Sequence, residues 1–135
     1  MGTTTTIKVA EYLATSYPDG DREYIDGHIV ERNVGEHVHA RIQALVASYL
    51  ITHYKQYGSG VAARVRVTAT RYRIPDVCLL TGPWPGPGRG PIIQAPFVAI
   101  EVLSPEDRAG EMQERIDDYL AAGVRYVWVV NPDYA

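Results

Sequence analysis

The sequence contains a single cysteine, Cys78, among its 135 residues. One thiol cannot form an intrachain disulfide, and its position in an apolar run suits a reducing interior. No apolar run approaches the roughly 18 residues that a membrane-spanning helix needs. The threonine-rich start, residues 3–6, lacks the basic region and apolar core of a signal peptide. These absences exclude a disulfide scaffold and a membrane-spanning protein, and we expect a cytoplasmic location.

Signals of several particular chemistries are also missing. No His/Cys spacing is typical of a zinc site. Ser104 lacks the glycines of a Gly-x-Ser-x-Gly nucleophile elbow, so it is better interpreted as a helix cap. The net charge of -3 argues against a protein that coats nucleic acid, although a local basic groove stays open. With 46% hydrophobic and 21% charged residues, the chain suits one globular domain over residues 1–135.

The first half of the chain predicts a hairpin followed by a long helix. Asp26-Gly27 lies between two β-prone pieces and favours a two-residue hairpin turn within 23–31. Apolar residues at helical spacing then predict a helix over about 36–57 that ends at Gly58.

The second half predicts strands with one further helix between them. Alternating valines and arginines predict a strand over 61–67 with one wet face. Ser104, with Asp107 closing a capping box, predicts the start of a helix that ends at Gly123. A final strand is expected over 125–130. The apolar residues that this second helix should bury are Met112, Ile116, Tyr119 and Leu120.

Two predicted strands, 75–80 and 97–103, each carry one carboxylate, Asp76 and Glu101, in an otherwise apolar run. A buried carboxylate is costly unless something pairs with it. If the strands are neighbours, the two carboxylates can share Mg²⁺, which prefers one or two carboxylates completed by waters and substrate phosphates. The pattern predicts a metal site on a sheet. Two alternatives stay open: Asp76 hydrogen-bonded to a turn, and a buried ion pair between Glu101 and Arg115.

The predicted elements follow the order helix, hairpin, helix, three strands, helix and strand. The closing strand–helix–strand unit implies a parallel pair with a right-handed crossover, whereas the middle strands can run antiparallel. We therefore expect an α/β fold, a mixed β-sheet flanked by helices.

Several segments together resemble a known family. Pro75-Asp76, followed by Glu101 and the residues up to Pro105, resembles the PD-(D/E)XK nuclease superfamily. More narrowly, the chain is similar to the bacterial restriction endonucleases of the Uma-two type, long filed as a domain of unknown function. The resemblance covers about 10–132 and implies a restriction-endonuclease-like fold and metal-dependent hydrolysis of DNA. The other matching segments are the family's hairpin, its helix-opening histidine and its closing helix–strand: 23–27, 39–42 and 119–132.

The resemblance assigns roles to three residues. Asp76 and Glu101 match the carboxylates that bind Mg²⁺ or Mn²⁺. The superfamily's usual lysine position, two residues after the second carboxylate, is Leu103 here. In this family the lysine lies on the next helix, four residues before the tyrosine, and that position is Arg115. An arginine can bind a phosphate through two N–H groups but cannot act as a base. Activation of the water would then fall to the metal.

Further roles are expected for a glutamate, a histidine and a group of arginines. Glu23 is a candidate acidic group near the metal, and an exposed hairpin carboxylate is the open alternative. His39 could contact phosphate or assist the water, or be an ordinary helix histidine. The densest basic stretch could contact the DNA backbone, unless it is only a solvated strand face. The arginines proposed for this contact are Arg64, Arg66 and Arg73.

The chain ends soon after the family's closing strand. Relatives generally continue past Asn131-Pro132 with more strand, whereas this sequence stops at Ala135. Missing strands would expose a sheet edge, which invites pairing with a second copy. We therefore also expect a homodimer.

Three functions follow in order of preference. The first is a magnesium-dependent DNA endonuclease. The second is a catalytically inactive relative that binds nucleic acid or scaffolds proteins, which Arg115 in the lysine position favours. A two-carboxylate glycosidase fits poorly, because the tryptophans fall in a loop and a core strand rather than in a sugar platform.

Overall fold

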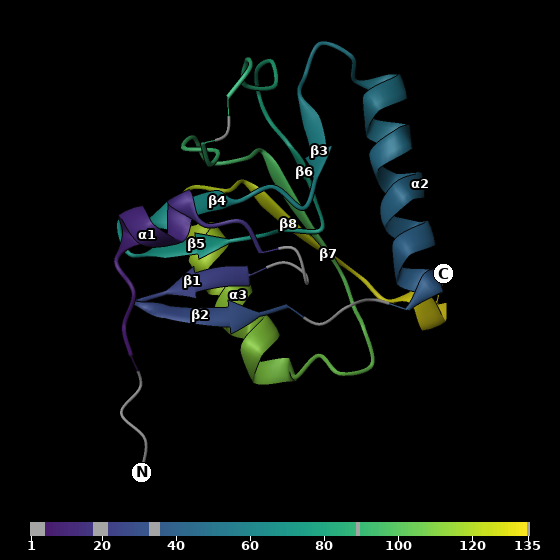
Figure 1. Ribbon diagram of the computed structural model, residues 1–135. Helices are drawn as coiled ribbons and strands as arrows, with labels where there is room; N and C mark the ends of the chain where they lie inside the picture. The colour runs from purple at the N-terminus through teal and green to yellow at the C-terminus, as the bar shows by residue number, and fades with distance from the viewer. Residues whose placement is uncertain (1–4, 18–21, 33–35, 89, 135) are drawn as a thin grey trace.

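The computed structural model describes residues 5–17, 22–32, 36–88 and 90–134. Within them, two four-stranded sheets are flanked by three α-helices (Figure 1). None of the described helices combines the length and apolar character needed to cross a bilayer. The helices are α1 (Val9–Ala14), α2 (His37–His53) and α3 (Ala109–Ala121), with a 3₁₀ turn η1 (Pro132–Tyr134). The strands are β1 (Arg22–Ile25), β2 (His28–Glu31), β3 (Ser59–Val61), β4 (Val65–Thr68), β5 (Arg71–Arg73), β6 (Val77–Leu79), β7 (Val98–Val102) and β8 (Tyr126–Val130).

The first sheet has the order β2-β1-β5-β4 and contains the predicted hairpin. Ile25 pairs with His28, and Asp26 and Gly27 between them have φ values of 49° and 94°. Two positive φ angles are what a type I′ turn requires, so the hairpin prediction is confirmed. The helix α1 lies against this sheet through a cluster of buried rings, Tyr12, Tyr24 and Tyr72.

The second sheet has the order β3-β6-β7-β8 and carries the carboxylate strands. β6 and β7 run antiparallel, and β7 and β8 run parallel, as the closing strand–helix–strand unit predicted. α2 stands along one side of this sheet, whereas α3 lies behind the hairpin on the other side of the molecule (Figure 1). The α2 face of the sheet has an apolar core in which Leu50 packs with Val77 and Ile100.

The strand β8 forms one edge of the second sheet. Tyr126, Trp128 and Val129 are exposed on it. The predicted homodimer would pair at such an edge. That assembly stays a prediction.

The mixed sheet flanked by helices is confirmed, but the strand expected over 61–67 is two strands, which lie in two different sheets. Ala62 has a φ of 50°, a left-handed conformation that ends the extended run. The residues before it form β3, which pairs with β6, and those after it form β4, which pairs with β5. The chain thus passes from one sheet to the other at this residue.

Both long helices are shorter than predicted. α2 ends at His53, with Tyr54 as its C-cap, rather than at Gly58. α3 begins at Ala109, because the Ser104 N–H donates to Asp107 Oδ2 at 2.8 Å and this pair closes a turn ahead of the helix. The capping pattern is therefore present but does not lead directly into the helix.

The buried face of α3 was predicted in part. Met112 and Tyr119 are buried, as expected, and Ile116 is half-buried. Leu120 is 50% exposed, so its assignment to the core is wrong. The face that turns inward instead includes Arg115, which places a guanidinium beside the strands of the second sheet.

Candidate active site

The two predicted carboxylates lie opposite each other on neighbouring strands. Val77 of β6 pairs with Ile100 of β7. One step further along this antiparallel ladder stand Asp76 and Glu101. Both are buried, and Glu101 has no exposed surface. The antiparallel pairing of β6 and β7 thus places these two negative charges side by side on neighbouring strands.

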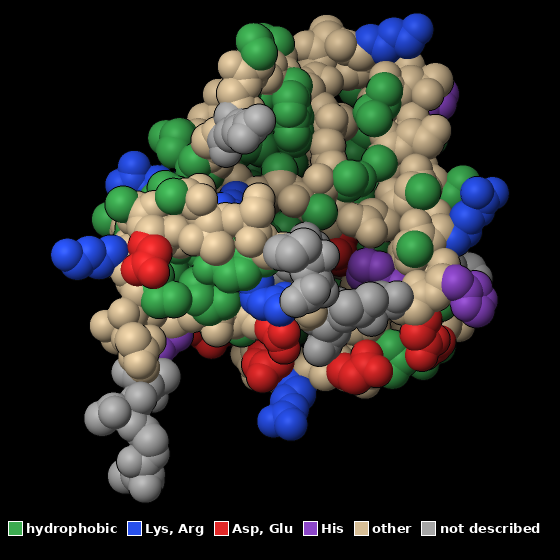
Figure 2. All heavy atoms as spheres, viewed as in Figure 1, with side chains coloured by type: hydrophobic (Ala, Val, Ile, Leu, Met, Phe, Trp, Pro, Cys, Tyr) green, Lys and Arg blue, Asp and Glu red, His purple; other side chains and the backbone are tan. Residues whose placement is uncertain are grey.

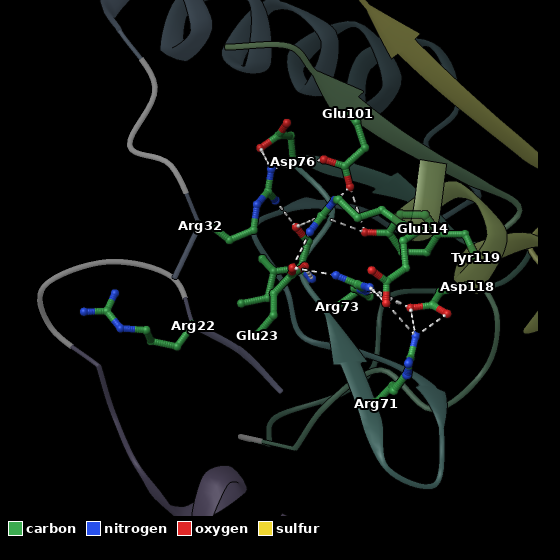
Figure 3. Close-up of polar contacts among 12 residues, drawn as sticks. Arg22, Glu23, Arg32, Arg71, Arg73, Asp76, Glu101, Glu114, Asp118 and Tyr119 are labelled. Carbon is green, nitrogen blue, oxygen red and sulfur yellow. Dashed lines mark hydrogen bonds and ion pairs between the residues drawn. The ribbon is translucent and has the colours of Figure 1, made fainter. Parts of the chain in front are cut away.

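A single cationic nitrogen lies between these carboxylates. Arg32 follows β2, and its Nη2 is 3.5 Å from Asp76 Oδ1 and 3.1 Å from Glu101 Oε2. Its other terminal nitrogen, Nη1, donates to the Ile74 carbonyl. In Figure 3 the Arg32 guanidinium points toward Asp76 and Glu101 from the hairpin side. Sequence reasoning missed this residue.

Arg115 reaches the second oxygen of Glu101 from α3. Its Nη2 donates to Glu101 Oε1 at 2.7 Å, and its Nη1 pairs with Glu23. The Tyr119 hydroxyl, one helical turn further on, donates to the same Glu101 oxygen at 2.7 Å. The ion pair that stood as the alternative for Glu101 is thus present, and a tyrosine hydroxyl supports it.

Glu23 lies inside the site and not on an exposed hairpin face. It is 1% exposed, and its Oε2 accepts the Ile74 backbone N–H at 2.6 Å. Its Oε1 is 3.3 Å from Arg73 Nη1 and also pairs with Arg115. Glu23 therefore connects the first sheet to the helix that carries Arg115.

Asp76 is oriented by the backbone of the next strand and by α2. Its Oδ2 accepts the Val102 N–H at 2.7 Å and lies 3.3 Å from His39 Nε2. The Gln43 side chain donates to the Asp76 carbonyl at 2.8 Å. The hydrogen bond from the Val102 N–H and the contact with His39 both use Oδ2, and Oδ1 faces Arg32.

The charges of this site balance without any bound ion. Burial alone would lower the pKa of Arg115, but Tyr119, Glu101 and Glu23 raise it well above its ordinary value. Burial also opposes the charge on Arg32, but the nearby Glu101 and Asp76 carboxylates raise its pKa. Burial and Glu101 together raise the pKa of Tyr119, so its hydroxyl stays a donor. Three carboxylates therefore face three guanidiniums: Glu23, Asp76 and Glu101 against Arg32, Arg73 and Arg115.

A cleft opens onto the site between the hairpin and α3. Arg108, at the start of α3, is an exposed cation on its wall. In Figure 2 most of the acidic side chains lie on the lower part of the face shown, whereas the hydrophobic ones are more frequent on the upper part. The charged residues that line the cleft are Glu23, Glu31, Arg32, Arg73, Asp107, Arg108, Glu111, Glu114 and Arg115.

The three arginines predicted to contact DNA lie in different surroundings. Arg64 donates to the carbonyls of Tyr12 and Thr15 and stacks 4.2 Å from the Tyr12 ring centre. Arg73 is 5% exposed and is paired with acidic residues. Arg66 is exposed on β4 but does not line the cleft. Contact with DNA therefore stays a prediction, and Arg66 is the member of the three that is free to make it from the surface.

The site offers a divalent cation such as Mg²⁺ few protein ligands. Among the described residues, no group of three or more histidine, cysteine, aspartate or glutamate side chains could hold a metal ion. Asp76 Oδ1 and Glu101 Oε2 nevertheless converge on one positive nitrogen. Two carboxylate oxygens, completed by waters and substrate oxygens, form the kind of site that Mg²⁺ accepts.

The mixed α/β fold, with paired carboxylates on adjacent strands, agrees with the nuclease-type arrangement that the family resemblance implies. The chain belongs to the family described as "Uma2: Putative restriction endonuclease", which it matches over residues 9–134. It is similar to a crystal structure described as a "putative nuclease belonging to DUF820" from Anabaena variabilis ATCC 29413, with a TM-score of 0.77 and 23% identity. That match covers 94% of this chain and 75% of the other, and it shows the fold. A comparison with curated proteins gave no match. The expected family and fold class are thus confirmed.

Proposed function

We propose that this chain is an endonuclease that depends on a divalent metal and hydrolyses phosphodiester bonds in DNA. The observation that carries the proposal is the convergence of Asp76 Oδ1 and Glu101 Oε2 on one cationic nitrogen, 3.5 and 3.1 Å away. Arg32 and Arg115, which contact these carboxylates, line an open cleft that carries both arginines and carboxylates. Membership of the Uma2 family supports a nuclease activity in general.

Asp76 and Glu101 would hold Mg²⁺ or Mn²⁺, which when bound polarises the phosphodiester and makes an attacking water more acidic. The protein fixes the two carboxylates before any ligand arrives. Arg115 and Tyr119 orient Glu101, and the Val102 N–H orients Asp76. Such preorganisation avoids rearrangement during the reaction.

Arg115 would bind the substrate phosphate while remaining paired with its carboxylates. It lines the cleft, and its Nε is buried without a hydrogen-bond partner in the described part of the chain. Because this N–H is enclosed, a phosphate in the cleft would interact with the positive charge of the guanidinium rather than with Nε. Arg115 cannot remove a proton from water.

His39 is the candidate for moving a proton. Its Nε2 lies 3.3 Å from Asp76 Oδ2, so the ring is held against one of the two carboxylates. Histidine is the side chain best suited to accept and release protons near neutral pH. Glu23 acts at one remove, because it positions Arg115 through their ion pair.

The DNA backbone would lie across the cleft beside α3. Arg108 supplies an exposed cation there, and Arg66 on β4 supplies another on a different surface. Contacts of this kind position a duplex without reading its sequence. The specificity of the enzyme would therefore depend on other contacts or on the shape of the substrate.

A second function is favoured by the balance of charge in the site. Arg32 and Arg115, together with Arg73, which also pairs with Asp118, give each of the three carboxylates a cationic partner without a metal. A nuclease fold stabilised in this way can serve as a nucleic-acid-binding or protein-interaction module. Metal-dependent cleavage separates the two functions.

The experiment is cleavage of supercoiled plasmid DNA with Mg²⁺ or Mn²⁺ and with a chelator. We expect nicking that requires the metal and falls at least about 100-fold in Asp76→Asn, because a metal contributes several kcal/mol of transition-state stabilisation. Asp117→Asn is the matched control, since Asp117 lies on the exposed face of α3 and bonds to Gln113. It should cleave like the wild type.

Two outcomes would overturn the nuclease assignment. Equal cleavage by Asp76→Asn would mean that a contaminating nuclease produces the signal. No cleavage by a folded wild-type protein with either metal would favour the binding module. Circular dichroism of each variant confirms that the fold is intact.

A further inference from the structure

Arg32 occupies the position that a metal shared by Asp76 and Glu101 would need. We propose that Arg32 is the resident cation of this site and that a divalent metal binds by displacing its guanidinium from the two carboxylates. The inference rests on the metal site of the proposed function. It adds that Arg32 competes with the metal for the two carboxylates and thereby lowers the affinity of the site for the metal.

One nitrogen of Arg32 bridges the two carboxylates. One nitrogen, Nη2, reaches an oxygen of each carboxylate, at 3.5 Å for Asp76 and 3.1 Å for Glu101. These are the oxygens that Arg115 does not use, since Arg115 binds Glu101 through Oε1. A guanidinium and a divalent ion cannot share this space, because they would repel each other strongly in a site shielded from water.

Arg32 is also the arginine of the site that is able to leave. Arg115 is tied to Glu23, Glu101 and the Ile74 carbonyl, and it is surrounded by the strands and α3. Arg32 comes from the end of the hairpin and lines the open cleft. Its side chain keeps 12% of its surface exposed, against 8% for Arg115, and it is held by Asp76, Glu101 and the Ile74 carbonyl.

The cleft offers the displaced guanidinium new partners. Glu31 and Glu111 line the same cleft and are exposed. A phosphate of the substrate would be a further partner, because a guanidinium binds phosphate oxygens through two parallel N–H groups. Displacement therefore moves Arg32 from the metal ligands to the side from which the substrate enters.

Calorimetric titration with Mn²⁺ alone tests the inference. We expect Arg32→Gln to bind Mn²⁺ at least about tenfold more tightly than the wild type, because the competing charge is gone. Arg125→Gln removes the same charge at the far end of β8 and should leave the affinity unchanged. Arg32→Gln combined with Asp76→Asn should lose the site, which assigns the binding to these carboxylates.

A second measurement covers the case in which Arg32→Gln folds poorly. In chelator, the variant should melt at a lower temperature than the wild type, because Glu101 and Asp76 lose a counter-charge. Mn²⁺ should then raise its melting temperature by more than it raises that of the wild type, because binding to the folded state stabilises it. An equal Mn²⁺ effect on both proteins, or equal affinities in calorimetry, would overturn the inference.

The two proposals fail in different ways. If the wild type cleaves DNA with Mg²⁺ but Arg32→Gln binds Mn²⁺ no more tightly, the proposed nuclease activity is supported. The proposed competition between Arg32 and the metal is then wrong. If Arg32→Gln binds Mn²⁺ more tightly but neither protein cleaves DNA, the competitor stands and the nuclease is wrong.

Discussion

The molecule contains two neighbouring clusters of ion pairs, each with acidic and basic side chains, which differ mainly in their access to water. The inner cluster lies between the sheets and consists of Glu23, Arg32, Asp76, Glu101 and Arg115. The outer cluster lies nearer the surface and consists of Asp26, Arg71, Glu114 and Asp118. Arg73 joins them, with Nη1 3.3 Å from Glu23 and Nη2 2.8 Å from Asp118 (Figure 3).

The difference shows that contact distance alone does not indicate how much an ion pair contributes to the stability of the fold. Arg71 is 2.8 Å from Asp26, a distance similar to the 2.7 Å between Arg115 and Glu101. The Asp26 side chain is 52% exposed and that of Glu101 is fully buried. Water screens the first pair, whereas a partner removed from the second would leave an uncompensated buried charge. The inner cluster should therefore be much more sensitive to substitution.

The largest expected effect is that of Glu101→Gln, which removes the charge shared by Arg32 and Arg115. We expect the free energy of unfolding to fall by about 3 kcal/mol or more, because two buried guanidiniums lose a partner. Urea denaturation measures the loss. Glu114→Gln makes the same chemical change in the outer cluster and should cost less than about 1 kcal/mol. Similar losses for the two variants would remove the distinction between the clusters.

A smaller effect is expected for Tyr119→Phe, which removes one donor and no charge. The hydroxyl donates to Glu101 Oε1 at 2.7 Å, and Arg115 still binds that oxygen after the change. The loss should be about 1.5–3 kcal/mol, as is usual for one hydrogen bond to a charged group. The comparison is with Tyr134→Phe, at an exposed position. A loss as large as that of Glu101→Gln would mean that the tyrosine, and not the charge, holds the cluster.

The sequence alone predicted the parts of the site that follow local periodicity. The apolar runs around Asp76 and Glu101 predicted strands, and the family's helix pattern pointed to Arg115. That the two strands are neighbours was a condition of the prediction and not its result. Turn chemistry predicted the hairpin, because Asp26-Gly27 favours positive φ at both residues. These features depend on neighbours within a few residues along the chain.

The features that were missed depend on contacts between distant segments. Arg32 is 69 residues from Glu101, and no periodicity links the end of a hairpin to a strand of another sheet. The division of the predicted strand at Ala62 likewise depends on which partner strand each half finds. Arg73 was predicted to lie on a surface that contacts DNA, because it belongs to a basic stretch of the sequence. Its guanidinium instead pairs with the buried Glu23.

The smallest expected effect is that of Asp26→Asn in the outer cluster. The half-exposed Asp26 accepts hydrogen bonds from Arg71 at 2.8 and 3.1 Å and from Thr70 at 2.8 Å. Asparagine suits the same turn, so the change removes the charge and keeps the hairpin. Near pH 7 the melting temperature of the variant should differ from that of the wild type by less than that of Tyr119→Phe.

The dependence of that difference on pH identifies its cause. Hydrogen bonds from Arg71 and then from Thr70 hold the pKa of Asp26 below its ordinary value. A carboxyl with a lowered pKa stabilises the fold above its unfolded pKa of about 3.9 and loses that contribution as the pH falls through the folded pKa. The wild type and Asp26→Asn should therefore converge in melting temperature below about pH 4. A difference that persisted unchanged in acid would show that Asp26 acts through the shape of the turn and not through its charge.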